Sequence, residues 1–176
     1  MDNLEFITFS KVYNYKNGDG KFCYINLTDN YFCVNLPTSK VIFDVDYSYN
    51  KPTLVISLTD KNLIEFIDNF KKVVIDFVYH NSKQIFGVQK SLSALEEFYC
   101  SPVKKSLKHF ADTLKLKLLN KKLNPLMRNT KIDIVLHISG LWFNSDSFGP
   151  YFDVMDLTLI ELPFTPKKNI YSFIDE

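Results

Sequence analysis

Hydrophobic and polar residues alternate most clearly in the last third of the chain. From Lys131 to Phe143 apolar residues occupy every second position, with Asp133, His137 and Ser139 between them, which is the pattern of a strand with one buried face. The segment NSDSFGP at residues 144–150 interrupts the pattern, and residues 151–162 resume it. We therefore expect an antiparallel hairpin of two long strands, with a bulge or a change of buried face in the second strand and a further bend at Gly140.

Shorter strand patterns fill the first third of the chain. Residues 4–15 and 22–27 are rich in aromatic and β-branched residues and flank NGDG at residues 17–20, a strong hairpin signal. Further strands are predicted at residues 31–36 and 41–45, which PTS at residues 37–39 separates, and at residues 53–58 and 114–119. Short strands with closely spaced turns are typical of a barrel or a sandwich.

The spacing of apolar residues changes to that of a helix at about residues 60–81. Leu63, Phe66, Ile67 and Phe70 begin a series at i, i+3, i+4 and i+7, so we expect an amphipathic helix with its apolar face in the core, ended by Phe86-Gly87. A short second helix is predicted at residues 92–99. No domain boundary is visible, and residues 1–165 are predicted to form one domain with a short C-terminal tail at residues 166–176.

Charge is distributed unevenly, although the net charge is only +1. Residues 101–131 contain nine Lys and Arg residues and one acidic residue, Asp112, whereas the sequence on both sides is acidic. Such a basic block favours contact with a polyanion at one place. The alternative is a solvated helix face and loop that binds nothing.

Residue types that commonly act in catalysis or bind metals form no recognisable motif in this sequence. The three cysteines, Cys23, Cys33 and Cys100, have no metal-ligand spacing, and their odd number favours a reducing, cytoplasmic location. The pairs Asp153/Asp156 and Asp44/Asp46 could form a two-metal carboxylate site, so one alternative function is a metal-dependent nuclease or nucleic-acid-modifying subunit. The other alternative is a scaffold that binds protein. We expect neither an enzyme nor a cofactor, and no apolar run is long enough for a membrane span.

Aromatic residues and lysines alternate on the predicted strands, and the chain contains 16 Phe and 10 Tyr. A sheet face that carries both can stack bases and pair with phosphates without reading sequence. A single Phe in such a strand is more often core, whereas Tyr suits a wet groove because its hydroxyl needs a partner. Strands, one helix and such a face describe an oligonucleotide-binding (OB) fold, a small Greek-key β-barrel. The candidate DNA-binding residues are Tyr13, Tyr15, Lys16, Lys21, Tyr24, Lys83, Tyr99, Lys104, Lys105, Lys108, Lys115 and Lys117.

Trp142 is the only tryptophan. It continues the even-numbered positions of the buried residues 132–138, so simple alternation predicts a buried side chain. A bulge at Gly140 would instead turn the ring toward the rim of the barrel, where it would be free to stack on DNA. We expect the buried position.

Several segments occur in the order and approximate spacing of a known family. They are NSK at residues 81–83 with FG at 86–87, EFYCSPVK at 97–104, LKLKL at 114–118, LHISGLWF at 136–143 and FG at 148–149. From about residue 20 to residue 162 the chain resembles the single-stranded DNA-binding proteins of large nucleo-cytoplasmic DNA viruses, which are similar to the replication protein of the same class from small tailed phages. The hairpin segment is the most specific part of the resemblance.

The resemblance implies an OB-fold protein that coats and protects unwound DNA during replication. It also implies replication proteins, such as a polymerase or a helicase, as partners. A compact family member from an A·T-rich virus-like element, such as a cytoplasmic linear plasmid, would fit the sequence. The chain departs from the phage members in its last residues, YSFIDE, a vestige of the acidic tail that recruits partners there. The oligomeric state, with a homodimer as one option, is left open.

Overall fold

The computed structural model describes residues 4–16, 18–28, 30–45, 52–107, 110–119 and 126–163. Within them the fold is mixed α/β, mostly strands with one long helix. Ten strands form one sheet in the order β1-β3-β9-β10-β8-β6, with β5 also paired to β9. The strands are β1 (Ile7–Phe9), β2 (Tyr13–Asn14), β3 (Lys21–Leu27), β4 (Asn30–Tyr31), β5 (Cys33–Lys40), β6 (Thr53–Leu58), β7 (Val103–Lys104), β8 (Asp112–Leu118), β9 (Lys131–Phe143) and β10 (Phe148–Glu161).

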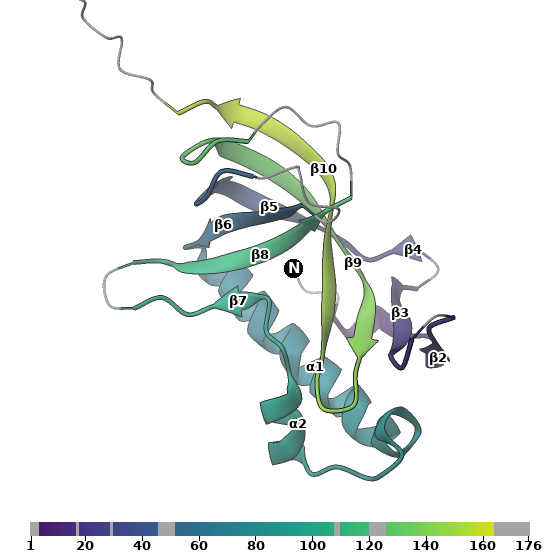
Figure 1. The fold of residues 1–176 in the computed structure, drawn as a ribbon. Helices are drawn as coiled ribbons and strands as arrows, with labels where there is room; N and C mark the ends of the chain where they lie inside the picture. The colour runs from purple at the N-terminus through teal and green to yellow at the C-terminus, as the bar shows by residue number, and fades with distance from the viewer. Residues whose placement is uncertain are drawn as a thin grey trace, which may run out of the picture.

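The β9–β10 hairpin forms the centre of the sheet, as the alternation predicts (Figure 1). Beta9 has the predicted limits, and β10 begins three residues earlier than expected. The register of the hairpin shifts between Tyr151 and Phe152 and again between Val154 and Asp156. The first shift leaves Ser139 without a partner on β10, next to the predicted bend at Gly140. Both predicted irregularities are therefore confirmed.

The predicted mainly-β fold with one long helix is confirmed, but the sheet is not closed into the small Greek-key barrel that was expected. The first half of β9 pairs with β5 and the second half with β3. Val41, the residue after β5, forms an isolated bridge with Ile56 of β6. Figure 1 shows β6 and β8 on one side of the central hairpin and β2 and β3 on the other.

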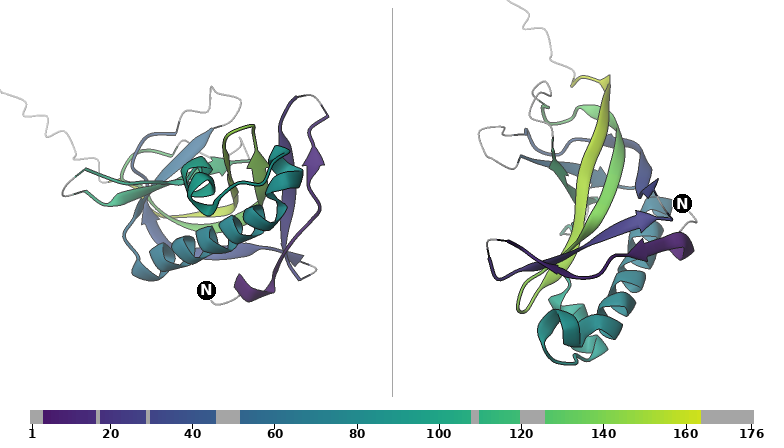
Figure 2. Two further views of the ribbon diagram at one scale, coloured as in Figure 1. Left: turned by 90° about the horizontal axis from the view of Figure 1, so that it is seen from below. Right: turned by 90° about the vertical axis from the view of Figure 1, so that its right-hand side faces the viewer.

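The long helix α1 (Lys61–Phe86) covers the inner face of the sheet (Figure 2). Asp60 caps its start by accepting the Leu63 N–H at 2.8 Å, and Gly87 ends it in the left-handed conformation. The helix is longer than predicted because Ile85 is also buried. The ring of Phe70 on α1 packs against the ring of Phe152 on β10, with 5.9 Å between the ring centroids. The predicted core face of the helix is confirmed.

Two smaller predictions meet different outcomes. The short second helix is present as α2 (Leu92–Phe98). The strand predicted at residues 31–36 is present as the end of β4 and the start of β5, but the predicted break at residues 37–39 is wrong, because β5 continues through Pro37 to Lys40. Of the strand predicted at residues 41–45, only Val41 makes a bridge. Pro37 lies within a register shift between Leu36 and Ser39, where the missing proline N–H costs the sheet no hydrogen bond.

Candidate nucleic-acid interface

A cluster of four rings, of which Tyr15 and Tyr24 are exposed, lies on the outer face of the β2–β3 hairpin. Tyr13 and Phe22 are directly opposite in the register, and their rings stack at 5.4 Å. Tyr15 also stacks on Phe22, at 5.1 Å, and Tyr24 meets Phe22 edge-on at 5.3 Å. Beta3 alternates in burial, with Cys23 and Ile25 in the core and Tyr24 about half exposed, at 53%. The four rings of this hairpin therefore pack against one another, and Tyr15 and Tyr24 are exposed to solvent.

The cluster continues across β9 and β10. Phe22 is opposite Trp142 in the β3–β9 register, and Tyr24 is opposite Gly140. Since directly opposed residues share one face of a sheet, Trp142 lies on the same outer face as Phe22. On β10, Tyr151 is opposite Gly140, and its hydroxyl hydrogen-bonds the Tyr15 hydroxyl of the hairpin turn. We call Tyr13, Tyr15, Phe22, Tyr24, Trp142 and Tyr151 the aromatic strip.

Trp142 is only partly buried, so the expectation that it is core is wrong. The unpaired Ser139 changes which positions of β9 face inward: Ile138 is buried, and beyond the bulge the buried residues are Leu141 and Phe143. The side chain of Trp142 extends over β10, where a Cβ atom at Gly149 would lie 3.0 Å from its Cζ2 atom. Glycine at position 149 therefore leaves room for the indole ring.

A row of lysines borders the strip on the side of β8. Burial along β8 alternates, with Leu114, Leu116 and Leu118 in the core and Lys115 and Lys117 on the outer face. Lys104 of β7 is opposite Thr113 and so joins this face. The Lys117 ammonium group lies over the Tyr151 ring, 5.6 Å from its centroid. Lys11 holds a similar position over Tyr13 at the far end of the strip, at 5.4 Å.

A groove of about 300 Å³ is lined by Lys115 and Lys117 together with Trp142 and Tyr151. Asp153 is buried beside it, accepts a hydrogen bond from the Ser139 hydroxyl at 2.6 Å, and lies 3.9 Å from the Lys117 ammonium group. Burial raises the pKa of the Tyr151 hydroxyl, and its bond to Tyr15 adds to this rise. Tyr151 thus stays neutral at physiological pH, and Asp153 is the only acidic residue among those described in contact with Lys117.

The structure places only some of the predicted residues at this surface. Tyr13, Tyr15, Tyr24, Lys115, Lys117 and Lys104 are on the outer face, and Lys16 is exposed just after β2. Lys83 is exposed on α1, away from the strip. Lys108 lies outside the described residues.

Three predicted residues have other roles. Lys21 donates to the carbonyl oxygens of Gln84 and Ile85 at 2.8 and 2.6 Å, so it caps the end of α1, where a cation is favoured. Tyr99 is buried, at 9% exposure, and packs on Phe148. Lys105 forms an ion pair with Asp112 at 2.8 Å, which raises the lysine pKa.

Sequence reasoning missed Tyr151 and assigned Trp142 to the core. Tyr151 follows the breaker segment directly, so nothing in the local pattern distinguishes it from a core ring. The outer position of Trp142 could have been predicted from Gly140, because a glycine within a strand often marks a bulge, and a bulge moves the residues that follow it to the other face of the sheet.

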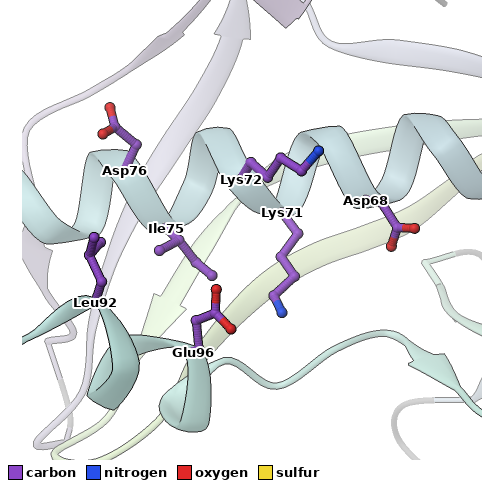
Figure 3. A pocket seen from close by; sticks show the side chains of 7 residues that line it. All are labelled: Asp68, Lys71, Lys72, Ile75, Asp76, Leu92 and Glu96. Atoms are coloured by element: carbon purple, nitrogen blue, oxygen red, sulfur yellow. The ribbon is translucent and has the colours of Figure 1, made fainter.

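A second hollow lies on the opposite side of the protein, between α1 and α2. Figure 3 shows this helix cleft, of about 600 Å³, with charged residues on both helices. Among the described residues no group of three His, Cys, Asp or Glu side chains is placed to hold a metal ion. No described helix is both long and apolar enough to span a membrane.

One comparison with known proteins gives a match. A family model with the description "Family of unknown function (DUF5871)" matches residues 39–175, more than half of the chain. The match begins after the β2–β3 hairpin and includes Trp142, Tyr151 and the lysine row. No curated protein and no solved structure matches the chain.

Proposed function

We propose that this chain, which belongs to the family of unknown function that matches residues 39–175, binds single-stranded DNA without catalysis and with little sequence preference. The observation that supports the proposal is the aromatic strip with lysines along its border. Large aromatic side chains are usually buried, whereas here six of them from four strands share one outer face. Such a face suits a ligand with flat rings and regularly spaced negative charges.

In this proposal bases stack on the rings and phosphates pair with the lysines. Tyr24 and Trp142 offer the best platforms, because Tyr24 is half exposed and Trp142 has the largest ring. Each stacked base contributes about 1–3 kcal/mol, and every base has a ring face, so the binding tolerates any sequence. Lys104, Lys115 and Lys117 supply the charge, and counterion release makes the affinity depend on salt.

The size of the strip sets a minimum footprint. Four strand spacings separate β2 from β8 along the path β2-β3-β9-β10-β8, which at roughly 4.8 Å each is about 19 Å. This span suits a footprint near the low end of the ~4–16 nucleotides that OB folds cover.

An OB-type architecture is part of the proposal. OB folds are five-stranded, partly open Greek-key barrels, and here β5, β9, β10, β8 and β6 form a curved path whose ends meet at one bridge. The helix α1 lies between β6 and the later strands in the chain. Coating of unwound DNA during replication is the role that we infer for such a protein.

The proposal is tested with oligonucleotides of equal length. Fluorescence anisotropy with labelled oligo(dT), duplex DNA and single-stranded RNA should show tightest binding to oligo(dT) and weakest to the duplex, whose stacked bases cannot reach the strip. Addition of Mg²⁺ should leave the labelled strand intact. Preference for duplex DNA, or cleavage that requires the metal, would contradict the proposal.

The lysine row makes a quantitative prediction about salt. Log affinity should fall linearly with log salt, by about 0.7 per phosphate neutralised on a single strand. The double substitution Lys104→Gln and Lys115→Gln, which leaves the pair between Lys117 and Asp153 intact, should therefore lower the slope by about 1.4. Lys105→Gln is the matched control, because Lys105 is paired with Asp112, and it should leave the slope unchanged. Equal slopes in the double variant and the wild type would place the phosphate contacts elsewhere.

A further inference from the structure

A contact between two sulfur atoms crosses the outer face of the sheet, beyond the aromatic strip. The Cys33 Sγ atom of β5 lies 3.4 Å from the Met155 Sδ atom of β10. Both strands pair with β9, which lies between them, so the contact passes over β9. We call Cys33, Met155 and His137 of β9 the sulfur cluster.

His137 lies next to this contact, because it is directly opposite Cys33 in the register of β5 and β9. The Ile138 N–H donates to the Phe32 carbonyl at 2.9 Å, so the adjacent pair Cys33–His137 is a non-hydrogen-bonded pair. In such pairs the Cα atoms are only about 4.5 Å apart and the side chains are close. Both residues alternate with buried neighbours and therefore share the outer face, where Tyr31 packs edge-on against the imidazole at 5.1 Å.

A β-bulge places Met155 at the same point. Val154 is opposite Leu136 and Asp156 is opposite Val135 in the register of β9 and β10, so Met155 is an extra residue without a partner on β9. Bulges commonly redirect a side chain near a functional site. Met155 is 56% exposed, so an ion from solvent can reach its sulfur.

The chemistry of the three side chains selects the metal ion. Thiolate and thioether sulfur are soft ligands that prefer copper(I), and imidazole also binds copper. Structural zinc sites are almost always four-coordinate, with Cys, His, Asp or Glu ligands. No group of three such side chains is placed to hold a metal within the part of the chain that the structure describes. The methionine sulfur completes a set of three here, and this ligand favours copper(I) over zinc, magnesium or calcium.

We propose that the sulfur cluster binds copper(I) through the Cys33 thiolate, the Met155 thioether and the neutral His137 imidazole. As the copper–sulfur bond forms, the Cys33 thiol releases its proton to solvent, and copper remains in the +1 state. The unbranched side chain of Met155 has three rotatable bonds, so its sulfur can move outward as the ion enters. The site shares no residue with the aromatic strip and does not depend on the proposed binding of DNA.

Titration of the full chain with copper(I) under anaerobic conditions tests this site, with bicinchoninate as the competing chelator. The protein should withdraw a single equivalent of copper(I) from the chelator. Met155→Leu and His137→Gln should each weaken binding by at least the roughly 10–100-fold that is typical for loss of a group that only supports a metal ligand. The methyl NMR signal of Met155 should shift in proportion to the copper bound, and zinc(II) at the same concentration should leave it unchanged.

Cys100→Ser and Met127→Leu are the matched controls, because Cys100 and Met127 are also exposed but lie outside the sulfur cluster. Both variants should keep the affinity of the wild type, and thermal unfolding verifies that every variant is folded. Failure to withdraw copper(I), an unshifted Met155 methyl signal, or loss of binding in Cys100→Ser would overturn the proposal. Wild-type affinity in both Met155→Leu and His137→Gln would also overturn it, because a thiol alone would then hold the ion.

Discussion

Replacing Tyr24 and Trp142 together with leucine is expected to weaken binding of oligo(dT) by about 2–6 kcal/mol, the loss of two stacked bases. Leucine keeps an apolar side chain at both positions but removes the aromatic face. Tyr24 is half exposed and Trp142 is partly exposed on the outer face, so the folded state should lose little stability. Anisotropy titration gives the affinity, and thermal unfolding verifies that the double variant is folded.

The matched control is Phe6→Leu. Phe6 is 55% exposed, and it belongs to the short helix Leu4–Phe6, which lies against α1 rather than on the strip. Affinity should be unchanged in this variant. An equal loss in the control and in the double variant, or a loss below about 0.5 kcal/mol in the double variant, against the 1–3 expected per base, would remove the strip from the interface.

Gly140→Ala is expected to lower the free energy of unfolding by about 3 kcal/mol or more, at or above the upper end of overpacking effects. A Cβ atom at this position would lie 2.2 Å from the carbonyl oxygen of Cys23, which is backbone and has no room to move within the β3–β9 pairing. That pairing joins Phe22 and Tyr24 to Trp142. The variant should therefore lose DNA affinity as well as stability, as measured by denaturant unfolding and anisotropy.

Gly87→Ala serves as its control. A Cβ atom there would meet nothing within 4 Å, and the only cost is the left-handed backbone, with φ at +79°, which is about 1–2 kcal/mol. Its DNA affinity should be that of the wild type. If Gly140→Ala were no more destabilising than Gly87→Ala, the close approach of β3 to β9 would be in error.

The elements that the sequence predicts well are those with long local patterns. Alternation over the first eight residues, up to Ile138, is enough to predict β9, and the repeated apolar spacing predicts α1, because each of these patterns follows from one buried face. The sequence analysis divided β5 into two strands because a proline usually interrupts a strand. The pairing of β5 with β9, which accommodates Pro37, involves residues that are distant in the sequence.

The candidate site depends on contacts that the local pattern does not contain. Lys21 lies next to aromatic residues in the sequence, which made it a candidate for binding DNA. The fold instead brings its side chain to the end of α1, more than 60 residues away in the sequence. Tyr99 is followed by several lysines in the sequence, but its bridge to Phe148 and its ring contact with that residue place it in the core. Conversely, Tyr15 and Tyr151 meet although 136 residues separate them. The type of surface was therefore predictable, and its exact membership was not.

The central claim is that the strip stacks on bases, and the fluorescence of Trp142 tests it most directly. Trp142 is the only tryptophan, so its emission reports on this face of the sheet alone. Titration with oligo(dT) should quench the emission strongly, with a midpoint that equals the Kd from anisotropy, and Lys105→Gln should give the same curve. Oligo(dT) that binds by anisotropy without changing the emission of Trp142 would contradict the account, because the DNA would then lie away from the strip.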